Sequence, residues 1–173
     1  MLHAVSLSAE RRSAWFLLLL SASALFGCAL YFQFGLALEP CVKCVYQRVA
    51  VVGIGAASLL GFIAPRLALV RFLAFALWLV SAIWGWFIAS EHLALQNAKN
   101  AFFMTCDSFP NFPDWAPLHQ WFPTLFSAPG VCGDIEWSFA GLSMPAWMQI
   151  IFAAYALIGI AVLLLRLLRL HRI

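Results

Sequence analysis

Two cysteines three positions apart are the residues of this sequence best suited to chemistry. Cys41 and Cys44 follow Pro40 and stand at the start of a long apolar run. A disulfide between residues this close adds little stability, because loop-closure models reward long loops. Such a pair is better suited to being opened and closed. The spacing therefore indicates a redox site rather than a structural cross-link.

The composition places this pair in a membrane protein. Of 173 residues, 65% are hydrophobic and 10% are charged, whereas soluble domains carry about 25% charged residues. A bilayer span needs roughly 20 apolar residues and must satisfy its own backbone hydrogen bonds, which favours helices. We therefore predict an all-α membrane protein, a bundle of four transmembrane helices that forms one domain over residues 1–173. The predicted spans are residues 14–38, 45–64, 67–90 and 145–165.

The basic residues predict the orientation of the bundle. Seven Lys and Arg side chains fall at the two termini and between the second and third spans, against three on the other side. By the positive-inside rule both termini are cytoplasmic, and loops 39–44 and 91–144 lie on the opposite, periplasmic side. The net charge of +3 then reports orientation. No basic patch interleaved with aromatic residues points to nucleic acid.

Arg48 is placed to stabilise a negative charge on one sulfur of the pair. The thiolate is the reactive form of cysteine, and a nearby positive charge favours it. Cys44 is expected in the first turn of a helix, where the helix dipole also favours an anion, and Arg48 follows one turn later on the same face. An arginine at this depth needs a partner, such as this sulfur or the oxygen of a bound electron acceptor. The alternative is that Arg48 reaches a lipid phosphate.

The other cysteines divide by location. Cys106 and Cys132 fall in loop 91–144, on the side where disulfides persist. Four cysteines on one side allow three pairings, and their spacing favours Cys41 with Cys44 and Cys106 with Cys132. Cys28 falls inside the first span, where we expect a small, buried and inert residue.

The segment between the third and fourth spans is too polar and too rich in proline to cross the membrane. Its tryptophans and phenylalanines are typical of the headgroup level, and residues 118–122 are predicted to form a short helix in the interface. A partly irregular loop of this kind could carry Cys106 and Cys132 between a soluble partner and the Cys41–Cys44 pair. Thiol–disulfide exchange requires such an accessible sulfur.

These motifs together resemble the DsbB family of disulfide bond formation proteins. The resemblance runs in order from about Trp15 to the end of the fourth span. It is carried by residues 40–48, Glu91, His92, Gln96, residues 105–107, residues 130–132 and residues 137–145. Lys43 and Gln47 depart from the most familiar form of the signature, which has an apolar residue and a glutamate there. We interpret these two departures as a sign of a different DsbA-like partner.

The resemblance implies an inner-membrane thiol oxidase that reoxidises a periplasmic DsbA-like protein and passes the electrons to the quinone pool. The acceptor would be ubiquinone or menaquinone. Cys106 would be joined to the partner, Cys132 would attack Cys41, and Cys44 would face the quinone. The residues implied in quinone contact are Cys44, Arg48, His92 and Gln96.

Two other classes of protein remain as alternatives. A structural or metal-binding bundle would hold zinc with four cysteine thiolates, and the positive charge of Arg48 would oppose such a site. A haem-binding electron carrier needs axial ligands inside the bundle. The four histidines, His3, His92, His119 and His171, lie outside the predicted spans or at an end of one. We therefore expect no metal.

Overall fold

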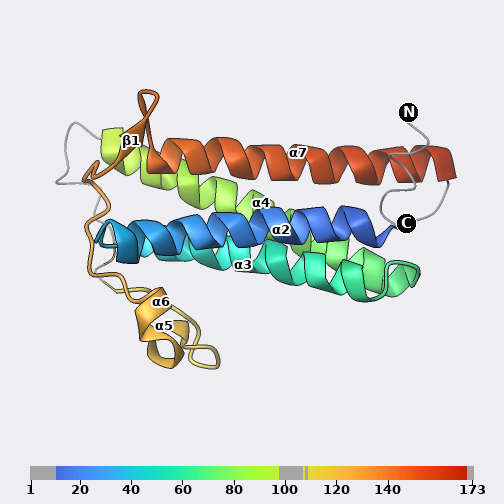
Figure 1. Cartoon of the computed structure of the whole chain (residues 1–173), viewed down its shortest axis with the longest axis horizontal. Helices are drawn as coiled ribbons and strands as arrows, with labels where there is room; N and C mark the ends of the chain where they lie inside the picture. Colours follow the sequence, from blue (N-terminus) through green and yellow to red (C-terminus); the bar gives the residue numbers. More distant parts are fainter. Residues whose placement is uncertain (1–10, 98–106, 108, 171–173) are drawn as a thin grey trace.

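Four long helices lie side by side in a bundle (Figure 1). The structure, a computed structural model, describes residues 11–97, 107 and 109–170. The long helices are α2 (Arg12–Leu30), α3 (Val42–Ile63), α4 (Ala68–Asn97) and α7 (Met144–Leu170). All four are long and apolar enough to cross a membrane. The predicted four-span, all-α membrane bundle is confirmed.

The helices begin and end at residues that differ from the predicted spans. Helix α3 begins at Val42, three residues earlier than predicted, and α4 continues to Asn97 rather than residue 90. Helix α2 is followed by a π-helical turn, η1 (Tyr31–Gly35). The predicted spans counted only apolar residues, whereas a helix continues into polar sequence as long as its backbone hydrogen bonds are satisfied. The extension of α4 matters most, because it places His92 and Gln96 on a rigid element.

The helices are held together by an aromatic core. The ring centroids of Trp15 and Phe75 lie 5.3 Å apart, and those of Phe75 and Trp78 lie 5.8 Å apart. Gly61 allows Trp15 to pack directly on the α3 backbone, since a Cβ there would overlap the indole ring. In the described residues α4 packs between α3 and α7, and α2 packs against α3. These aromatic contacts lie toward the end of the bundle opposite the cysteine pair, where α2 begins and α3 ends.

Cys28 does not lie in this core. It is exposed on the outside of α2, so the expectation of a buried residue was wrong. In α2 the structure buries only Trp15 and Ala22, because this helix leaves most of its surface free of neighbouring helices. The sequence could not show this, since an apolar run looks the same whether it faces lipid or protein.

The segment between α4 and α7 contains short elements at one end of the bundle (Figure 1). Helices α5 (Leu118–Trp121) and α6 (Pro123–Phe126) follow one another, so the predicted short helix is found. A hairpin that the sequence did not predict joins β1 (Ser138–Phe139) to β2 (Leu142–Ser143). Its turn residues Ala140 and Gly141 both have positive φ, as type I′ turns require. The turn between α3 and α4 lies at the opposite end of the bundle.

Candidate functional site

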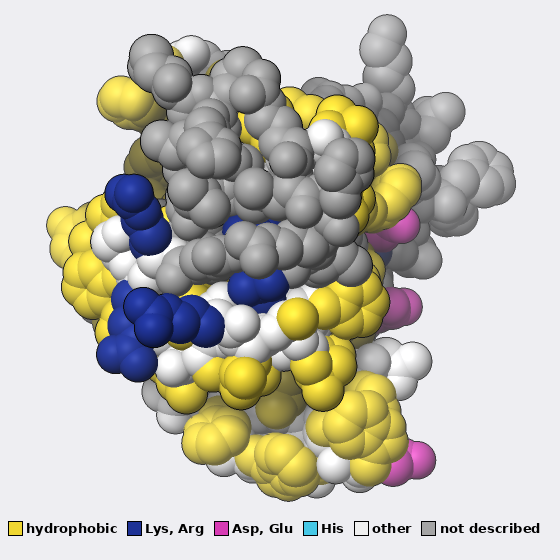
Figure 2. All heavy atoms as spheres, turned by 90° about the vertical axis from the view of Figure 1, so that its right-hand side faces the viewer, with side chains coloured by type: hydrophobic (Ala, Val, Ile, Leu, Met, Phe, Trp, Pro, Cys, Tyr) yellow, Lys and Arg dark blue, Asp and Glu magenta, His cyan; other side chains and the backbone are white. Residues whose placement is uncertain are grey.

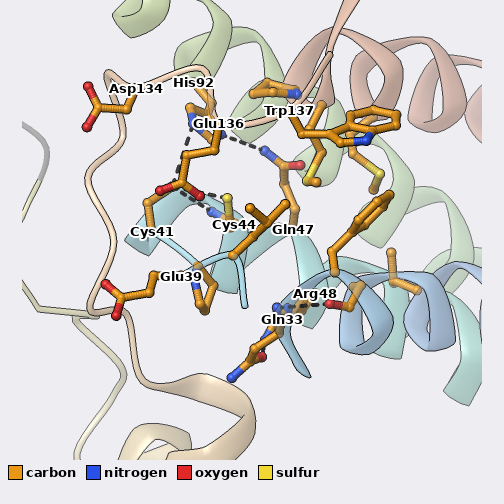
Figure 3. Close-up of a pocket in the computed structure, with 18 of the residues that line it drawn as sticks. Gln33, Glu39, Cys41, Cys44, Gln47, Arg48, His92, Asp134, Glu136 and Trp137 are labelled. Carbon is orange, nitrogen blue, oxygen red and sulfur yellow. Dashed lines mark hydrogen bonds between the residues drawn. The ribbon is translucent and has the colours of Figure 1, made fainter. Parts of the chain in front are cut away.

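A pocket at the loop-bearing end of the bundle brings most of the predicted site residues together (Figure 3). Its volume is about 880 Å³, including the open mouth. Residues of α2, α3, α4 and α7 line it together with the loops before α3 and α7. Five of the predicted residues are among them: Cys41, Cys44, Arg48, His92 and Gln96. Cys132 is not among them, and Cys106 lies outside the described residues.

The cysteine pair sits where α3 begins. Cys41 is the N-cap residue, with extended backbone angles, and its sulfur accepts a hydrogen bond from the Cys44 backbone N–H at 3.4 Å. The two sulfurs lie 3.1 Å apart. A bonded disulfide would bring them to about 2.05 Å, so the structure describes the dithiol. A helix N-terminus favours a negative charge at this position.

The negative charge of the dithiol belongs on Cys41. A hydrogen bond from the Cys44 thiol is the largest effect and lowers the pKa of Cys41 to about 4, even though burial of Cys41 opposes the shift. His92 assists, since its Nε2 lies 3.6 Å from the Cys41 sulfur. From the sequence we expected Cys44 to be the anion. The difference arises mainly from the hydrogen bond between the two cysteines, and His92 adds to it from another helix, which local spacing could not show.

Arg48 is buried, with 7% of its surface exposed. Its Nη1 donates to Gln33 Oε1 at 2.6 Å and to the Leu125 carbonyl at 2.9 Å, and its Nη2 donates to the Ala29 carbonyl at 3.4 Å. The alternative of an arginine that reaches out to lipid phosphate is therefore wrong. In the part of the chain that the structure describes, no carboxylate pairs with Arg48. Its positive charge is directed at neutral oxygens at the wall of the pocket.

The two predicted residues of α4 differ in how they are engaged. His92 is buried, with 3% exposed, between the Cys41 sulfur and the Gln47 amide, whose Nε2 lies 3.3 Å from His92 Nδ1. Gln96 lines the pocket but uses its amide to hold the loop before α7. It accepts from the Ser143 hydroxyl at 2.8 Å and donates to the Asp134 carbonyl at 3.2 Å. His92 thus contacts the dithiol, whereas Gln96 shapes the wall.

Two glutamines belong to the site although sequence reasoning did not place them there. Gln33 holds Arg48, and Gln47, with 5% exposed, contacts His92. Gln33 lies in an otherwise apolar run, and Gln47 stands beside Arg48 inside a predicted span. A polar side chain inside a predicted span is the signal that could have identified them, because an amide in such surroundings needs hydrogen-bond partners.

Lys43, the other departure from the familiar signature, has a structural partner. Its ammonium lies 2.6 Å from Glu91 Oε2 and joins the start of α3 to α4. The side chains are 20% and 60% exposed. An exposed pair of this kind contributes about 0–1 kcal/mol. Lys43 therefore helps to hold α3 against α4 at the rim of the pocket. The ion pair is not one of the groups that would react.

The loop that carries Cys132 packs against the residues before the cysteine pair. Gly130 donates its backbone N–H to the Pro40 carbonyl at 3.1 Å. A Cβ at Gly130 would overlap the Glu39 carbonyl, so only glycine allows this approach. Cys132 is buried and disulfide-bonded, and Cys106, its expected partner, lies outside the described residues. The contact brings the neighbourhood of Cys132 to that of Cys41.

The positions of the cysteines bear on the alternative of a zinc site with four thiolates. Within the described ranges, one group of three metal-ligating side chains has its ligand atoms within 4.8 Å of one another: Cys41, Cys44 and His92. The alternative required four cysteine thiolates, and Cys132 is bonded to another sulfur. The cysteines therefore do not form that zinc site.

Comparisons with known proteins agree with the motifs. The family model described as "Disulfide bond formation protein DsbB" matches residues 11–162. A protein named disulfide bond formation protein B from Idiomarina loihiensis is 58% identical over 149 residues, which cover 86% of this chain and 82% of the relative. Proteins of the same name from Pseudoalteromonas atlantica and Shewanella loihica are 49% and 45% identical. They cover 94% and 89% of this chain, and 95% and 90% of the relatives.

Proposed function

Because this chain belongs to the DsbB family, we propose that its pocket passes electrons from a DsbA-type dithiol protein to a membrane quinone. The chain is a disulfide oxidoreductase of the membrane, and the assignment of steps to residues is our proposal. The observation that carries it is the shared pocket. Cys41, Cys44 and Arg48 face one cavity whose other walls are largely apolar, with Leu25 and Met148 among them.

The first steps move a disulfide from the long loop to the pocket. A thiolate of the partner attacks Cys106 of a Cys106–Cys132 disulfide, which forms a mixed disulfide and frees the Cys132 thiolate. Cys132 then attacks Cys41, breaks the Cys41–Cys44 bond and releases Cys44 as a thiolate. The second thiol of the partner resolves the mixed disulfide and frees Cys106. Cys106 then attacks Cys132, which restores the Cys106–Cys132 disulfide and releases Cys41 as a thiolate. The contact between Gly130 and Pro40 supports this order, because it holds the loop of Cys132 beside Cys41.

The last steps take place in the pocket. When bound, the quinone accepts two electrons and two protons and becomes the quinol. Arg48 offers N–H groups and a positive charge to an electron-rich oxygen, and such charge-assisted hydrogen bonds are the stronger ones. Cys44 faces the same space. The apolar walls fit the ring of either ubiquinone or menaquinone, so the choice between them is left to experiment.

The distribution of charge supports an orientation in the bacterial inner membrane. Figure 2 shows dark blue Lys and Arg side chains on the end of the bundle opposite the cysteine pocket. Arg11, Arg12 and Arg66 surround a depression there. By the positive-inside rule this end, with both termini, faces the cytoplasm. The cysteine pairs would then face the periplasm, where disulfides persist.

The proposal is tested by following quinone absorbance. Purified protein is mixed with a reduced DsbA-type protein and with ubiquinone or menaquinone analogues in turn. We expect quinone reduction by the unaltered protein and none by Cys44→Ser, because that substitution removes the sulfur that faces the acceptor. Sustained turnover by Cys44→Ser would refute the proposal. The acceptor with the larger kcat/KM identifies the quinone.

A further inference from the structure

Three buried side chains contact one another in series. Cys41 and Gln47, at the start of α3, both contact His92 of α4. The Cys41 sulfur lies 3.6 Å from His92 Nε2, and His92 Nδ1 lies 3.3 Å from Gln47 Nε2. Their exposed fractions are 2%, 3% and 5%. Figure 3 shows the imidazole between the sulfur and the amide, with both contacts drawn. Water is thus largely excluded, and the three groups set one another's hydrogen bonding.

The amide determines which ring nitrogen carries the proton. A neutral imidazole has one N–H donor and one acceptor nitrogen. The Gln47 N–H donates to Nδ1, so Nδ1 is the acceptor and the proton is on Nε2. Nε2–H then points at the Cys41 sulfur. The opposite amide orientation would put the proton on Nδ1 and turn a lone pair toward the sulfur, which a thiolate would repel.

We propose that Gln47 is a positioning residue that holds His92 as the Nε2–H tautomer, so that a neutral His92 donates to Cys41 and keeps it a thiolate. Gln47 touches neither sulfur in the described contacts and acts through His92. After the hydrogen bond from Cys44, the hydrogen bond from His92 is a further cause of the low pKa of Cys41. Hydrogen bonds to a charged group are stronger than hydrogen bonds between neutral groups.

The thiolate serves the step that closes the disulfide. This role rests on the proposed function. Once Cys106 has displaced Cys41 from Cys132, the Cys41 sulfur would bond to the Cys44 sulfur as the electron pair of this site passes to the quinone. The two electrons released by the two thiolates pass to the quinone, which also takes up two protons. A Cys41 that stays deprotonated needs no separate base for this step.

Whether residue 47 is a glutamine or a glutamate decides the protonation state in which His92 can donate to Cys41. A carboxylate only accepts hydrogen bonds, so it would hold the proton on Nδ1. Nε2 could then donate to Cys41 only as part of a charged imidazolium. Gln47 removes this requirement. The other titratable groups that line the pocket are Glu39, Cys44, Arg48, Asp134 and Glu136, and the Lys43–Glu91 ion pair lies at its rim.

The test measures how Cys41 of the reduced, full-length protein titrates. Iodoacetamide labelling is followed at each cysteine by peptide mass spectrometry across a pH series. We expect Gln47→Leu to raise the midpoint for Cys41 by about one pH unit, a tenfold loss of thiolate below the midpoint. His92→Phe should raise it at least as far. The double variant should go no further than His92→Phe, because Gln47 acts through the imidazole.

Two further variants guard against a purely structural effect. Gln149→Leu removes another partly buried glutamine, which donates to Ser90, and should leave the midpoint unchanged. Gln47→Glu should add a second inflection to the Cys41 profile, where the imidazolium loses its proton. If Gln47→Leu does not fold, this inflection alone decides the question. A Gln47→Glu profile that matches the unaltered protein would overturn the proposal, as would an effect of Gln47→Leu that persists without His92.

The outcome is separate from the test of the proposed function. If the unaltered protein reduces quinone but Cys41 titrates with the same midpoint in Gln47→Leu, only the proposed role of Gln47 is refuted. If the unaltered protein oxidises no partner and reduces no quinone, the proposed function fails. The titration of Cys41 still reports whether Gln47 controls His92 in that case.

Discussion

Two buried arginines at opposite ends of the bundle differ in their surroundings, since one lines the cysteine pocket and the other holds a turn. Arg48 near the start of α3 and Arg71 near the start of α4 are 7% and 4% exposed, and both donate to backbone carbonyls. Arg48 also lines the pocket with Cys44 and is held there by Gln33. Arg71 donates to the Pro65 carbonyl and so holds the turn between α3 and α4. We therefore propose a functional role for Arg48, which shares a pocket with a reactive group, and a structural role for Arg71.

The largest expected effect separates a cysteine in the pocket from one outside it. Cys41→Ser should reduce quinone-linked oxidation of the partner to background, because no disulfide can form with Cys44. Cys28→Ser should stay within about twofold of the unaltered rate, as surface substitutions usually do. Initial rates with reduced partner and quinone check both. Comparable losses in the two variants would contradict the distinction between pocket and exterior.

The arginines themselves provide the second comparison. Arg48→Ala should raise the KM for quinone by about 10- to 100-fold, from the loss of a hydrogen bond to a charged group worth about 1.5–3 kcal/mol. Arg71→Ala should lower thermal stability and leave this KM unchanged, because Arg71 lies at the other end of the bundle. Steady-state kinetics and thermal unfolding in detergent measure the two quantities.

The matched control is Arg48→Lys, which keeps the charge but loses the planar guanidinium fork. Its KM should fall between those of Arg48→Ala and the unaltered protein. An equal rise in KM in the Arg71→Ala and Arg48→Ala variants would remove the functional distinction between the two arginines.

The third effect is a pH dependence confined to the cysteine end. The pKa of Cys41 is lowered in the folded dithiol to about 4, below the ordinary value of about 8.5. This group therefore stabilises the reduced protein fully above about pH 8.5, and the contribution is lost as pH falls toward 4. Ultraviolet absorbance of the thiolate should disappear with a midpoint near pH 4. A midpoint near 8.5 would show that Cys41 is an ordinary thiol.

The smallest effect concerns the rim of the pocket. A double-mutant cycle of Lys43→Ala and Glu91→Ala should give a coupling of about 0.2–1 kcal/mol in the free energy of unfolding. The coupling should weaken in high salt, since the pair is exposed and screened. Thermal or denaturant unfolding at two salt concentrations measures it. A salt-independent coupling of several kcal/mol would mean that the ion pair supports the site more strongly than its exposure implies.

Much of the fold and part of the site follow from the sequence. The four spans follow from the length of the apolar runs, and Cys41, Cys44 and Arg48 follow from local helical spacing. The hydrogen bonds of His92 to Cys41 and Gln47 could not be predicted, because they depend on how α4 packs against α3. The outward position of Cys28 was missed for a related reason. Hydrophobicity identifies a membrane helix but does not show which face meets lipid.

The most direct test of the central claim is the stoichiometry of a single turnover. Reduced DsbA-type protein is mixed anaerobically with the purified chain and excess quinone, and partner thiols and quinol are counted together. We predict one quinol for each pair of partner thiols oxidised, since both electrons leave through the Cys41–Cys44 pair. Oxidation of the partner without quinol, or quinol formed at the same rate by Cys44→Ser, would contradict it.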